Sequence, residues 1–335
     1  MSTSTDQLAQ RLCWIYPDRG TVRQRAAEAD AIWTTYTKIA ADCGLRMSIH
    51  KSEALAAEMP DEGEPRVFLD GERITPEDTI LVTSLWSLPH QVNEVCNQLF
   101  AYSIVEQAGF YLPIHPRMSY ITTDKLATML YLKDSPVRRV PTVRIGTGRD
   151  AISRHYEPAL ANLEYPLLVK PAYWGMGIGV CLVRNEHELR GVIGLAGGAD
   201  TALVVQPYLG EGVEDWRVYV IDGVPHTVLR RIPQGASLTA NLVNGGRLEY
   251  PPVPDELKGA LEYIARQLDM PYFAADFLWD GKQFWLSEVE PDGACGYAPT
   301  EEVAAIQRPV IEDRFRAYIA AHARWIAERN GGGAA

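Results

Sequence analysis

The sequence has few of the features that would assign it quickly to a class of protein. Its five cysteines, in a chain of 335 residues, form no CxxC pair and no metal-like spacing, so we expect reduced thiols and no zinc centre. No apolar run is long enough to cross a bilayer, and residues 1–11 contain no apolar signal segment. We therefore expect a cytoplasmic protein without a membrane partner.

Positive charge is also scarce. The chain carries 32 Lys and Arg against 43 Asp and Glu, which gives a formal net charge of −11. Nucleic-acid binding needs clustered Lys and Arg to contact phosphates, so we expect no nucleic acid as a partner. A local basic pocket for ATP is still compatible with this balance.

Familiar catalytic and nucleotide-binding patterns are missing too. There is no Walker A sequence, and the glycines of residues 175–179, GMGIG, have the wrong spacing for a dinucleotide fingerprint. They also lead into a predicted strand instead of a helix. No Ser/His/Asp or Cys/His set stands out, and we interpret His90 and His115 as structural or substrate-loop residues.

What is present indicates an α/β protein of several parts. A length of 335 residues implies two or three subdomains. Residues 11–50 show a β-α-β pattern, which predicts an open parallel sheet in an N-terminal domain over residues 1–119. We predict a second, α+β subdomain over residues 120–210 and a third over residues 211–330. The glycine-rich residues 331–335 are expected to form a disordered tail.

Apolar periodicity and turn residues place the individual elements. Strands are predicted at residues 11–16, 46–50, 79–85, 203–206, 216–221 and 224–231, with a small hairpin at residues 66–74. Helices are predicted at residues 23–43, 93–107, 123–131, 186–193, 255–268 and 302–328.

Residues 273–293 contain the strongest local signal for a site. Asp280-Gly281 lies between two apolar, aromatic-rich runs, which is typical of a β-hairpin. Acids inside such runs cost free energy unless a charge compensates them, and carboxylate oxygens are ligands that Mg²⁺ prefers. The alternative is a solvated edge hairpin with its acids outside. The three acids on these runs are Asp276, Glu288 and Glu290.

The register of this hairpin tests the metal hypothesis. A strict two-residue turn would pair Trp279 with Lys282. Asp276 and Glu288 would then face opposite sides, because side chains alternate along a strand. One metal site can use both acids only if the hairpin contains an odd residue, either in a three-residue loop or as a β-bulge.

Residues 167–183 predict a phosphate-binding hairpin. An apolar strand ends near Lys170, a glycine-rich loop follows with Gly175, Gly177 and Gly179, and a second strand comes after it. Glycines let backbone N–H groups approach a phosphate closely, and Lys170 is well placed to contact one. A mobile hairpin loop without a ligand is the alternative.

Two further stretches offer weaker signals. Residues 204–209, VVQPYL, can present backbone groups to the edge of an adenine and an apolar wall to its face, or form a plain strand exit. Residues 229–247 form either a solvated loop or a set of donors suited to a polyanion held with a metal. Those donors are Arg230, Arg231, Asn241, Asn244 and Arg247.

The order of these features along the chain resembles that of the ATP-grasp superfamily. The closest resemblance is to its glutathione synthetase and RimK-like branch of ATP-dependent carboxylate-amine ligases. It is strong over residues 124–293, and over residues 11–123 only the strand-helix pattern matches. The resemblance implies an ATP-grasp fold, with an N-terminal open parallel sheet and two α+β subdomains that enclose ATP.

The resemblance also implies a role for each candidate residue. Lys125 and Lys170 would contact the ATP phosphates, under a loop formed by Gly175, Gly177 and Gly179. The adenine site would be lined by Gln206, Tyr208 and Leu209, and Asp215 would bind the ribose. Arg217 and Arg231 would meet the γ-phosphate or an acyl phosphate. Two Mg²⁺ would be held by Asp276, Glu288 and Glu290, with Asn241 nearby.

One position departs from the family pattern. The family usually ends this strand with Glu-x-Asn, and this chain has Glu290 there. The reaction implied by the resemblance needs no protein nucleophile: a carboxylate is phosphorylated by ATP, and an amine then displaces the phosphate. Small-molecule, peptide and carrier-bound substrates all remain open, as does a homo-oligomer. The alternatives are an ATP-grasp kinase acting on a hydroxyl and a non-catalytic ATP-binding regulator.

Overall fold

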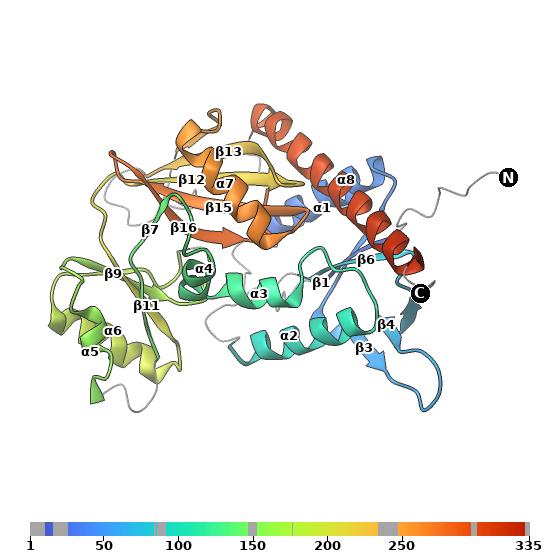
Figure 1. Cartoon of the computed structure of the whole chain (residues 1–335), viewed down its shortest axis with the longest axis horizontal. Coiled ribbons are helices and arrows are strands. Elements are labelled where there is room, and N and C mark those ends of the chain that lie inside the picture. Colours follow the sequence, from blue (N-terminus) through green and yellow to red (C-terminus); the bar gives the residue numbers. More distant parts are fainter. Residues whose placement is uncertain are drawn as a thin grey trace.

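A computed structural model of the chain describes residues 11–15, 26–83, 85, 92–146, 153–175, 177–233, 247–295 and 300–331. Within these residues the strands form four sheets. Figure 1 shows the N-terminal strands on one side of the molecule and the two larger sheets on the other, with α3 and α4 between them.

The N-terminal part contains the expected parallel sheet. Strand β1 (Arg11–Ile15) lies between β2 (Arg46–His50) and β6 (Thr79–Thr83), and both pairings are parallel. Helix α1 (Ala26–Asp42) connects β1 to β2, so the predicted β-α-β unit is confirmed. All five residues of β6 are buried, as is usual for strands of a covered parallel sheet.

A small antiparallel sheet follows β2. It consists of β3 (Leu55–Glu58), β4 (Arg66–Leu69) and β5 (Glu72–Ile74). The β4–β5 hairpin was predicted from Asp70-Gly71, which both have positive φ here. Strand β3 was not predicted, because LAAE is poor in β-branched and aromatic residues.

Three helices lead to the larger sheets. They are α2 (Val92–Gln107), α3 (Pro116–Thr123) and α4 (Lys125–Tyr131). The Asp124 carboxylate accepts hydrogen bonds from the backbone N–H groups of Leu126 and Ala127, at 3.0 and 3.1 Å, and so caps α4. The domain limits stay a prediction, and the limit placed at residue 120 falls inside α3.

A four-stranded antiparallel sheet has the order β10-β9-β11-β8. Its strands are β8 (Val143–Ile145), β9 (Leu167–Pro171), β10 (Cys181–Val183) and β11 (Leu203–Pro207). Helices α5 (Glu157–Leu160) and α6 (Glu186–Gly198) accompany it, and α6 extends five residues beyond the predicted end at 193. Leu189 and Ile193 of α6 pack with Val169 and Val205 in the core of this part.

The six-stranded sheet has the order β14-β13-β12-β15-β16-β7. Its strands are β7 (Arg138–Arg139), β12 (Glu214–Ile221), β13 (Val224–Ile232), β14 (Arg247–Glu249), β15 (Tyr272–Trp279) and β16 (Phe284–Glu290). Helix α7 (Asp255–Leu268) has the predicted bounds and buries its apolar face. The candidate metal acids lie on β15 and β16, inside this sheet, so a solvated edge hairpin is the wrong interpretation.

Helix α8 (Glu301–Gly331) joins the N-terminal and C-terminal parts. Its buried residues Phe315 and Tyr318 belong to one hydrophobic core that includes Trp14 of β1 and Phe273 of β15. Figure 1 shows this helix running from the six-stranded sheet toward the N-terminal strands. Gly331 was predicted to lie in a disordered tail, but it is the last residue of α8. Residues 332–335 lie outside the described residues.

None of the helices in the described ranges is both long and apolar enough to cross a membrane.

Candidate active site

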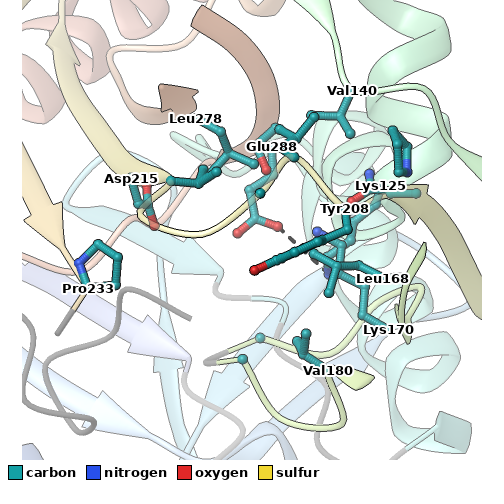
Figure 2. Close-up of a pocket in the computed structure, with 18 of the residues that line it drawn as sticks. Lys125, Val140, Leu168, Lys170, Val180, Tyr208, Asp215, Pro233, Leu278 and Glu288 are labelled. Carbon is teal, nitrogen blue, oxygen red and sulfur yellow. Dashed lines mark ion pairs between the residues drawn. The ribbon is translucent and has the colours of Figure 1, made fainter. Parts of the chain in front are cut away.

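A cavity of about 170 Å³ lies where β9, β11, α4 and the acidic hairpin meet. Figure 2 shows Lys125, Lys170, Tyr208 and Glu288 converging on it. The cavity is lined by nine of the predicted residues: Lys125, Lys170, Gly175, Gly177, Gln206, Tyr208, Leu209, Asp215 and Glu288. Four other predicted residues, Arg217, Arg231, Asp276 and Glu290, lie beside it without lining it, in contact with one another. Asn241 lies outside the described residues.

Two lysines enter the cavity from different elements. Lys125, the first residue of α4, donates from Nζ to the Trp174 carbonyl at 2.8 Å and lies 3.7 Å from Oε2 of Glu288. Lys170 comes from β9. Burial, together with the Lys125 ammonium, lowers the pKa of Lys170 to about 8. Two cations that repel each other in a partly enclosed cavity favour an anion between them.

The three predicted glycines lie in two different surroundings. Gly175 and Gly177 line the cavity, and the Ile178 N–H donates to the Gly175 carbonyl at 3.2 Å, which closes a turn. Gly179 does not line the cavity. It has a φ of +75°, and a Cβ there would lie 2.9 Å from Cγ of Pro171. Gly179 therefore serves packing and backbone conformation, because an L side chain fits neither.

Residues after β11 form the less charged end of the cavity. Tyr208 and Leu209 line it together with Leu168 and Leu278. Gln206 is buried, and its Nε2 donates to Oγ1 of Thr142 at 2.7 Å. An apolar wall beside exposed backbone groups is the arrangement that a flat heterocyclic base requires.

Asp215 lies between this end and the acids. Its Oδ2 is 2.8 Å from Nη2 of Arg231, whereas the buried Oδ1 has no hydrogen-bond partner among the described residues. Burial raises the pKa of this carboxyl group, against the effect of Arg231. An unpaired acceptor in a cavity wall suits a hydroxyl donor on a ligand.

The acidic hairpin contains the odd residue that a shared metal site requires. Asp276 pairs with Glu288, while the next residue, Phe277, pairs with Leu286. Ser287 is thus the extra residue of a β-bulge. The bulge puts ligand oxygens of all three acids within 4.8 Å of one another; the acids are Asp276, Glu288 and Glu290.

The turn of this hairpin differs from the two-residue turn considered above. Trp279 pairs with Phe284 rather than with Lys282. The Asp280 carboxylate accepts from the backbone N–H groups of Lys282 and Gln283 at 2.8 and 2.9 Å. This side chain stabilises a longer loop, so Asp280-Gly281 does not form the two-residue turn.

Two arginines bind the acids directly. Arg217 on β12 lies opposite Asp276 on β15, and it donates from Nε and Nη2 to the two carboxylate oxygens at 2.8 and 2.7 Å. Its Nη2 is also 2.7 Å from Oε1 of Glu290. Arg231 reaches the same Asp276 carboxylate at 3.2 Å. Arg247, one of the donors predicted for a polyanion, pairs with Glu249 at 2.7 Å.

These contacts set the charge state of the acids. Burial opposes ionisation of Asp276, but Arg217 and Arg231 outweigh it and lower its pKa. Glu290 behaves differently. Burial, with the repulsion from Asp276 and Glu288, raises the pKa of Glu290 to about 7 despite Arg217.

The acidic and basic residues around the cavity are equal in number. Four are acids and four are bases: Asp215, Asp276, Glu288 and Glu290 against Lys125, Lys170, Arg217 and Arg231. The donor set fits Mg²⁺, because three carboxylates converge and a cation would relieve the repulsion that, after burial, raises the pKa of Glu290. A bound metal at Asp276 would share or replace the contact with Arg217.

The family model of the RimK-like ATP-grasp domain matches residues 122–297, which is more than half of the chain. The chain belongs to the RimK-like ATP-grasp family. The matched region contains both lysines, the glycine loop and the acidic hairpin. The resemblance inferred from the order of the motifs is therefore confirmed.

Individual relatives agree with this assignment. Glutathione synthetase of Xylella fastidiosa is 29% identical over 212 residues, which are 58% of this chain and 62% of that protein. D-alanine--D-alanine ligase of Syntrophotalea carbinolica is 32% identical over 123 residues, 35% of this chain and 40% of that protein. The matches to the D-alanine ligases therefore span less than half the length of those relatives.

A solved structure supports the ATP-grasp fold over nearly the whole chain. It is the ATP-grasp ligase PsnB complexed with minimal precursor, Mg and ADP, with a TM-score of 0.58 at 15% identity. The match covers 94% of this chain and 99% of that chain. At this identity the likeness shows the fold alone, and the predicted α/β ATP-grasp fold is confirmed.

Sequence reasoning missed several contacts of the site. Ser287 forms the bulge, and the Trp174 carbonyl accepts from Lys125. The pairing of Arg217 with Asp276 was missed as well. A signal for Ser287 exists in the sequence: the alternation of Phe284–Glu290 breaks where a small polar residue precedes Glu288.

Proposed function

We propose that this RimK-like ATP-grasp protein is an ATP-dependent carboxylate-amine ligase that forms an amide bond. The observation that carries the proposal is one cavity that is lined both by two lysines and by Glu288 of a three-acid cluster. Cations placed for phosphate and oxygen ligands placed for Mg²⁺ are the two requirements for positioning a nucleotide triphosphate for phosphoryl transfer.

Each wall of the cavity has a role in this proposal. The adenine lies against Tyr208 and Leu209, near the backbone after Gln206. A ribose hydroxyl donates to the unpaired Oδ1 of Asp215. The phosphates extend to Lys125 and Lys170 under Gly175 and Gly177, with Asn241 as a further proposed contact.

Asp276, Glu288 and Glu290 would hold Mg²⁺, and two ions are proposed because three carboxylates converge. The metal would supply charge neutralisation for the phosphoryl group being transferred. The protein then contributes position and charge. Lys170, Arg217 and Arg231 stabilise negative charge on the phosphoryl oxygens, as Arg217 and Arg231 do for the Asp276 carboxylate in the structure.

The reaction proceeds in two displacements. A carboxylate oxygen of the acid substrate attacks the γ-phosphorus, the bond to the β–γ bridging oxygen breaks, and ADP leaves. The nitrogen of an amine then attacks the acyl carbon of the acyl phosphate. Phosphate leaves with the original carboxylate oxygen, and the nitrogen loses a proton. The acid and amine are proposed to be small molecules or peptides.

A screen for ADP release tests the proposal. Purified protein with Mg-ATP is offered carboxylic acids with and without an amine, and hydroxylamine serves as a general amine that yields a hydroxamate. We expect ADP and hydroxamate to form together with the correct acid. The matched control is Lys170→Met, which keeps the aliphatic chain and removes the charge. Hydroxyl compounds are screened in parallel, and ADP formation with phosphate retained on one of them would instead establish a kinase. Nucleotide binding without turnover for any acid would favour a regulator.

A further inference from the structure

A short segment follows Glu290, the last candidate metal ligand in the sequence, and each of its residues makes a hydrogen bond or an ion pair. Residues 292–295, here called the post-β16 segment, begin two positions after Glu290. The Tyr272 hydroxyl donates to the Gly293 carbonyl at 2.5 Å, and the Tyr219 hydroxyl donates to the Ala294 carbonyl at 3.0 Å. The Cys295 N–H donates to the Tyr36 hydroxyl at 3.1 Å. Arg314 forms an ion pair with Asp292.

Arg314 is a buried charged residue among these contacts. It comes from α8 and is only 1% exposed. Its guanidinium lies 4.0 Å from the ring centroid of Tyr272 and 4.7 Å from that of Trp14. Nε donates to the Tyr318 hydroxyl at 2.8 Å. Aromatic faces and Asp292 thus stabilise a charge that would otherwise be costly inside the protein.

The contacts come from parts of the chain that are distant in sequence. Trp14 and Tyr36 belong to the N-terminal parallel sheet and its helix α1. Tyr272 belongs to β15, the strand of Asp276. Figure 1 shows α8, which carries Arg314, lying between these two parts. The N-terminal part therefore reaches the post-β16 segment directly, through the Tyr36 hydroxyl.

The post-β16 segment is also tied closely to Glu290. The Gly293 N–H donates to the Glu290 carbonyl at 3.2 Å, which closes a turn right after β16. A Cβ at Gly293 would lie only 2.4 Å from Cβ of Ala274, the residue that pairs with Glu290 across the hairpin. The turn therefore sits against β15, and displacing it would displace the Glu290 backbone.

We propose that Tyr36 and Arg314 are positioning residues for the metal-binding carboxylates, through which the N-terminal part sets the affinity for Mg²⁺. They act by holding the post-β16 segment, and so the Glu290 carboxylate, in register with Asp276 and Glu288. This inference rests on the proposed function, because it assumes that the three acids bind Mg²⁺. Neither residue touches the nucleotide site, so their effect is expected on metal affinity rather than on nucleotide affinity.

The test uses hydroxyl deletions that preserve packing. Tyr36→Phe removes only the oxygen that accepts from Cys295, and Tyr219→Phe removes the donor to Ala294. Asp292→Asn weakens the contact with Arg314. The matched control is Tyr131→Phe, which deletes a hydroxyl that donates to a backbone carbonyl, that of Gln267, at 2.7 Å, away from the post-β16 segment. Full-length proteins are titrated with ADP by calorimetry at a series of Mg²⁺ concentrations, and Mn²⁺ binding is followed by electron paramagnetic resonance.

We expect the half-saturating Mg²⁺ concentration to rise about 10-fold in Tyr36→Phe, the lower end of the effect typical of groups that orient metal ligands. Tyr219→Phe and Asp292→Asn should change it in the same direction. ADP affinity at saturating Mg²⁺ should stay as in the unmodified protein, and Tyr131→Phe should change neither quantity. If one variant fails to fold, the other two still decide the outcome.

Two results would overturn the inference while leaving the proposed function standing. One is an unchanged Mg²⁺ requirement in folded Tyr36→Phe and Asp292→Asn proteins. The other is an equal loss of ADP affinity at saturating Mg²⁺, which would indicate general loosening of the structure. Failure of the unmodified protein to bind Mg²⁺ with ADP would instead overturn the proposed function.

Discussion

Arg217 binds Asp276 across two neighbouring strands through a pair of hydrogen bonds of 2.8 and 2.7 Å. The same arginine contacts Glu290 at 2.7 Å. A buried acid and a buried arginine thus neutralise each other where the proposed reaction needs a metal and a phosphoryl group. We infer that entry of Mg²⁺ with a polyanion exchanges these partners: the acids turn to the metal, and the arginine turns to phosphate.

Replacing Arg217 tests how much stability this contact provides. Arg217→Met leaves Asp276, whose side chain is only 4% exposed, without its main counter-charge, so the free energy of unfolding should fall by about 3–5 kcal/mol in urea denaturation. The matched control is Arg230→Met on β13, whose partners Glu214 and Glu249 are partly exposed. It should cost about 1 kcal/mol or less. Equal losses in the two variants would contradict a special role for the buried pair.

The lowered pKa of Lys170 predicts that nucleotide binding depends on pH. Its pKa in the free protein is lowered to about 8, so the ammonium is present below that pH and is lost as the pH rises through it. An anion favours the charged form, and binding should therefore take up a proton once the pH exceeds about 8, and should weaken as the pH rises further. Calorimetry of ADP binding in buffers of different ionisation enthalpy measures the uptake. Lys170→Met should show none, and persistent uptake in that variant would assign the proton to another group.

The raised pKa of Glu290 predicts that the stability of the metal-free protein depends on pH. Its pKa is raised from 4.5 to about 7, so the folded state holds a proton that the unfolded chain has released. The stabilisation is complete below about pH 4.5 and is lost as the pH rises through about 7. Unfolding measured with a chelator present should show this decline, and it should be reduced in Glu290→Gln, which keeps the shape and cannot ionise. A decline of the same size in Glu290→Gln would mean that another group causes it.

The metal role of Glu290 is tested separately. An Asn at this position would offer a neutral oxygen on a shorter arm, so Glu290→Asn should keep activity but need more Mg²⁺. Glu288→Ala should lose activity, because it removes an acid that lines the cavity. A Mg²⁺ titration of turnover decides. An unchanged requirement in Glu290→Asn would leave the metal site to Asp276 and Glu288.

Alanine substitutions at Gly179 and Gly212 distinguish the cost of backbone strain from the cost of a steric contact. Both have a φ of +75°, but only at Gly179 would a Cβ meet another residue, Pro171. Gly212→Ala should cost about 1–2 kcal/mol of unfolding free energy from its left-handed backbone alone. Gly179→Ala should cost more, because the contact with Pro171 adds to that strain. Equal costs would show that the loop after β9 shifts to accept the methyl group.

Local chemistry explains which parts could be predicted from the sequence. The bounds of α7 follow from Pro254-Asp255 at its start and a strong apolar stripe, both of which are local. The bulge at Ser287, next to the Asp276–Glu288 pair, is one of the two solutions expected from asking how two acids could share one metal. The side-chain bonds of Asp280 that lengthen the turn are local too, but Asp-Gly suits several loop lengths.

The rest depends on pairings that a single sequence does not show. Arg217 meets Asp276 because β12 pairs with β15, two strands separated by α7 and about fifty residues. Tyr36 meets Cys295 across an even larger separation. The family resemblance implied a phosphate role for both arginines, yet only the sheet order reveals that they contact the acids.

The most direct test of the proposed acyl-phosphate reaction traces an oxygen atom from the acid substrate into the released phosphate. The acid substrate found in the screen is prepared with ¹⁸O in its carboxylate and incubated with Mg-ATP, the amine and the protein, and the released phosphate is analysed by mass spectrometry. The proposed reaction transfers one carboxylate oxygen into the phosphate, so we expect singly labelled phosphate in step with amide formation, and none with Lys170→Met. Unlabelled phosphate, or a phosphoryl group retained on the substrate, would contradict a ligase that acts through an acyl phosphate.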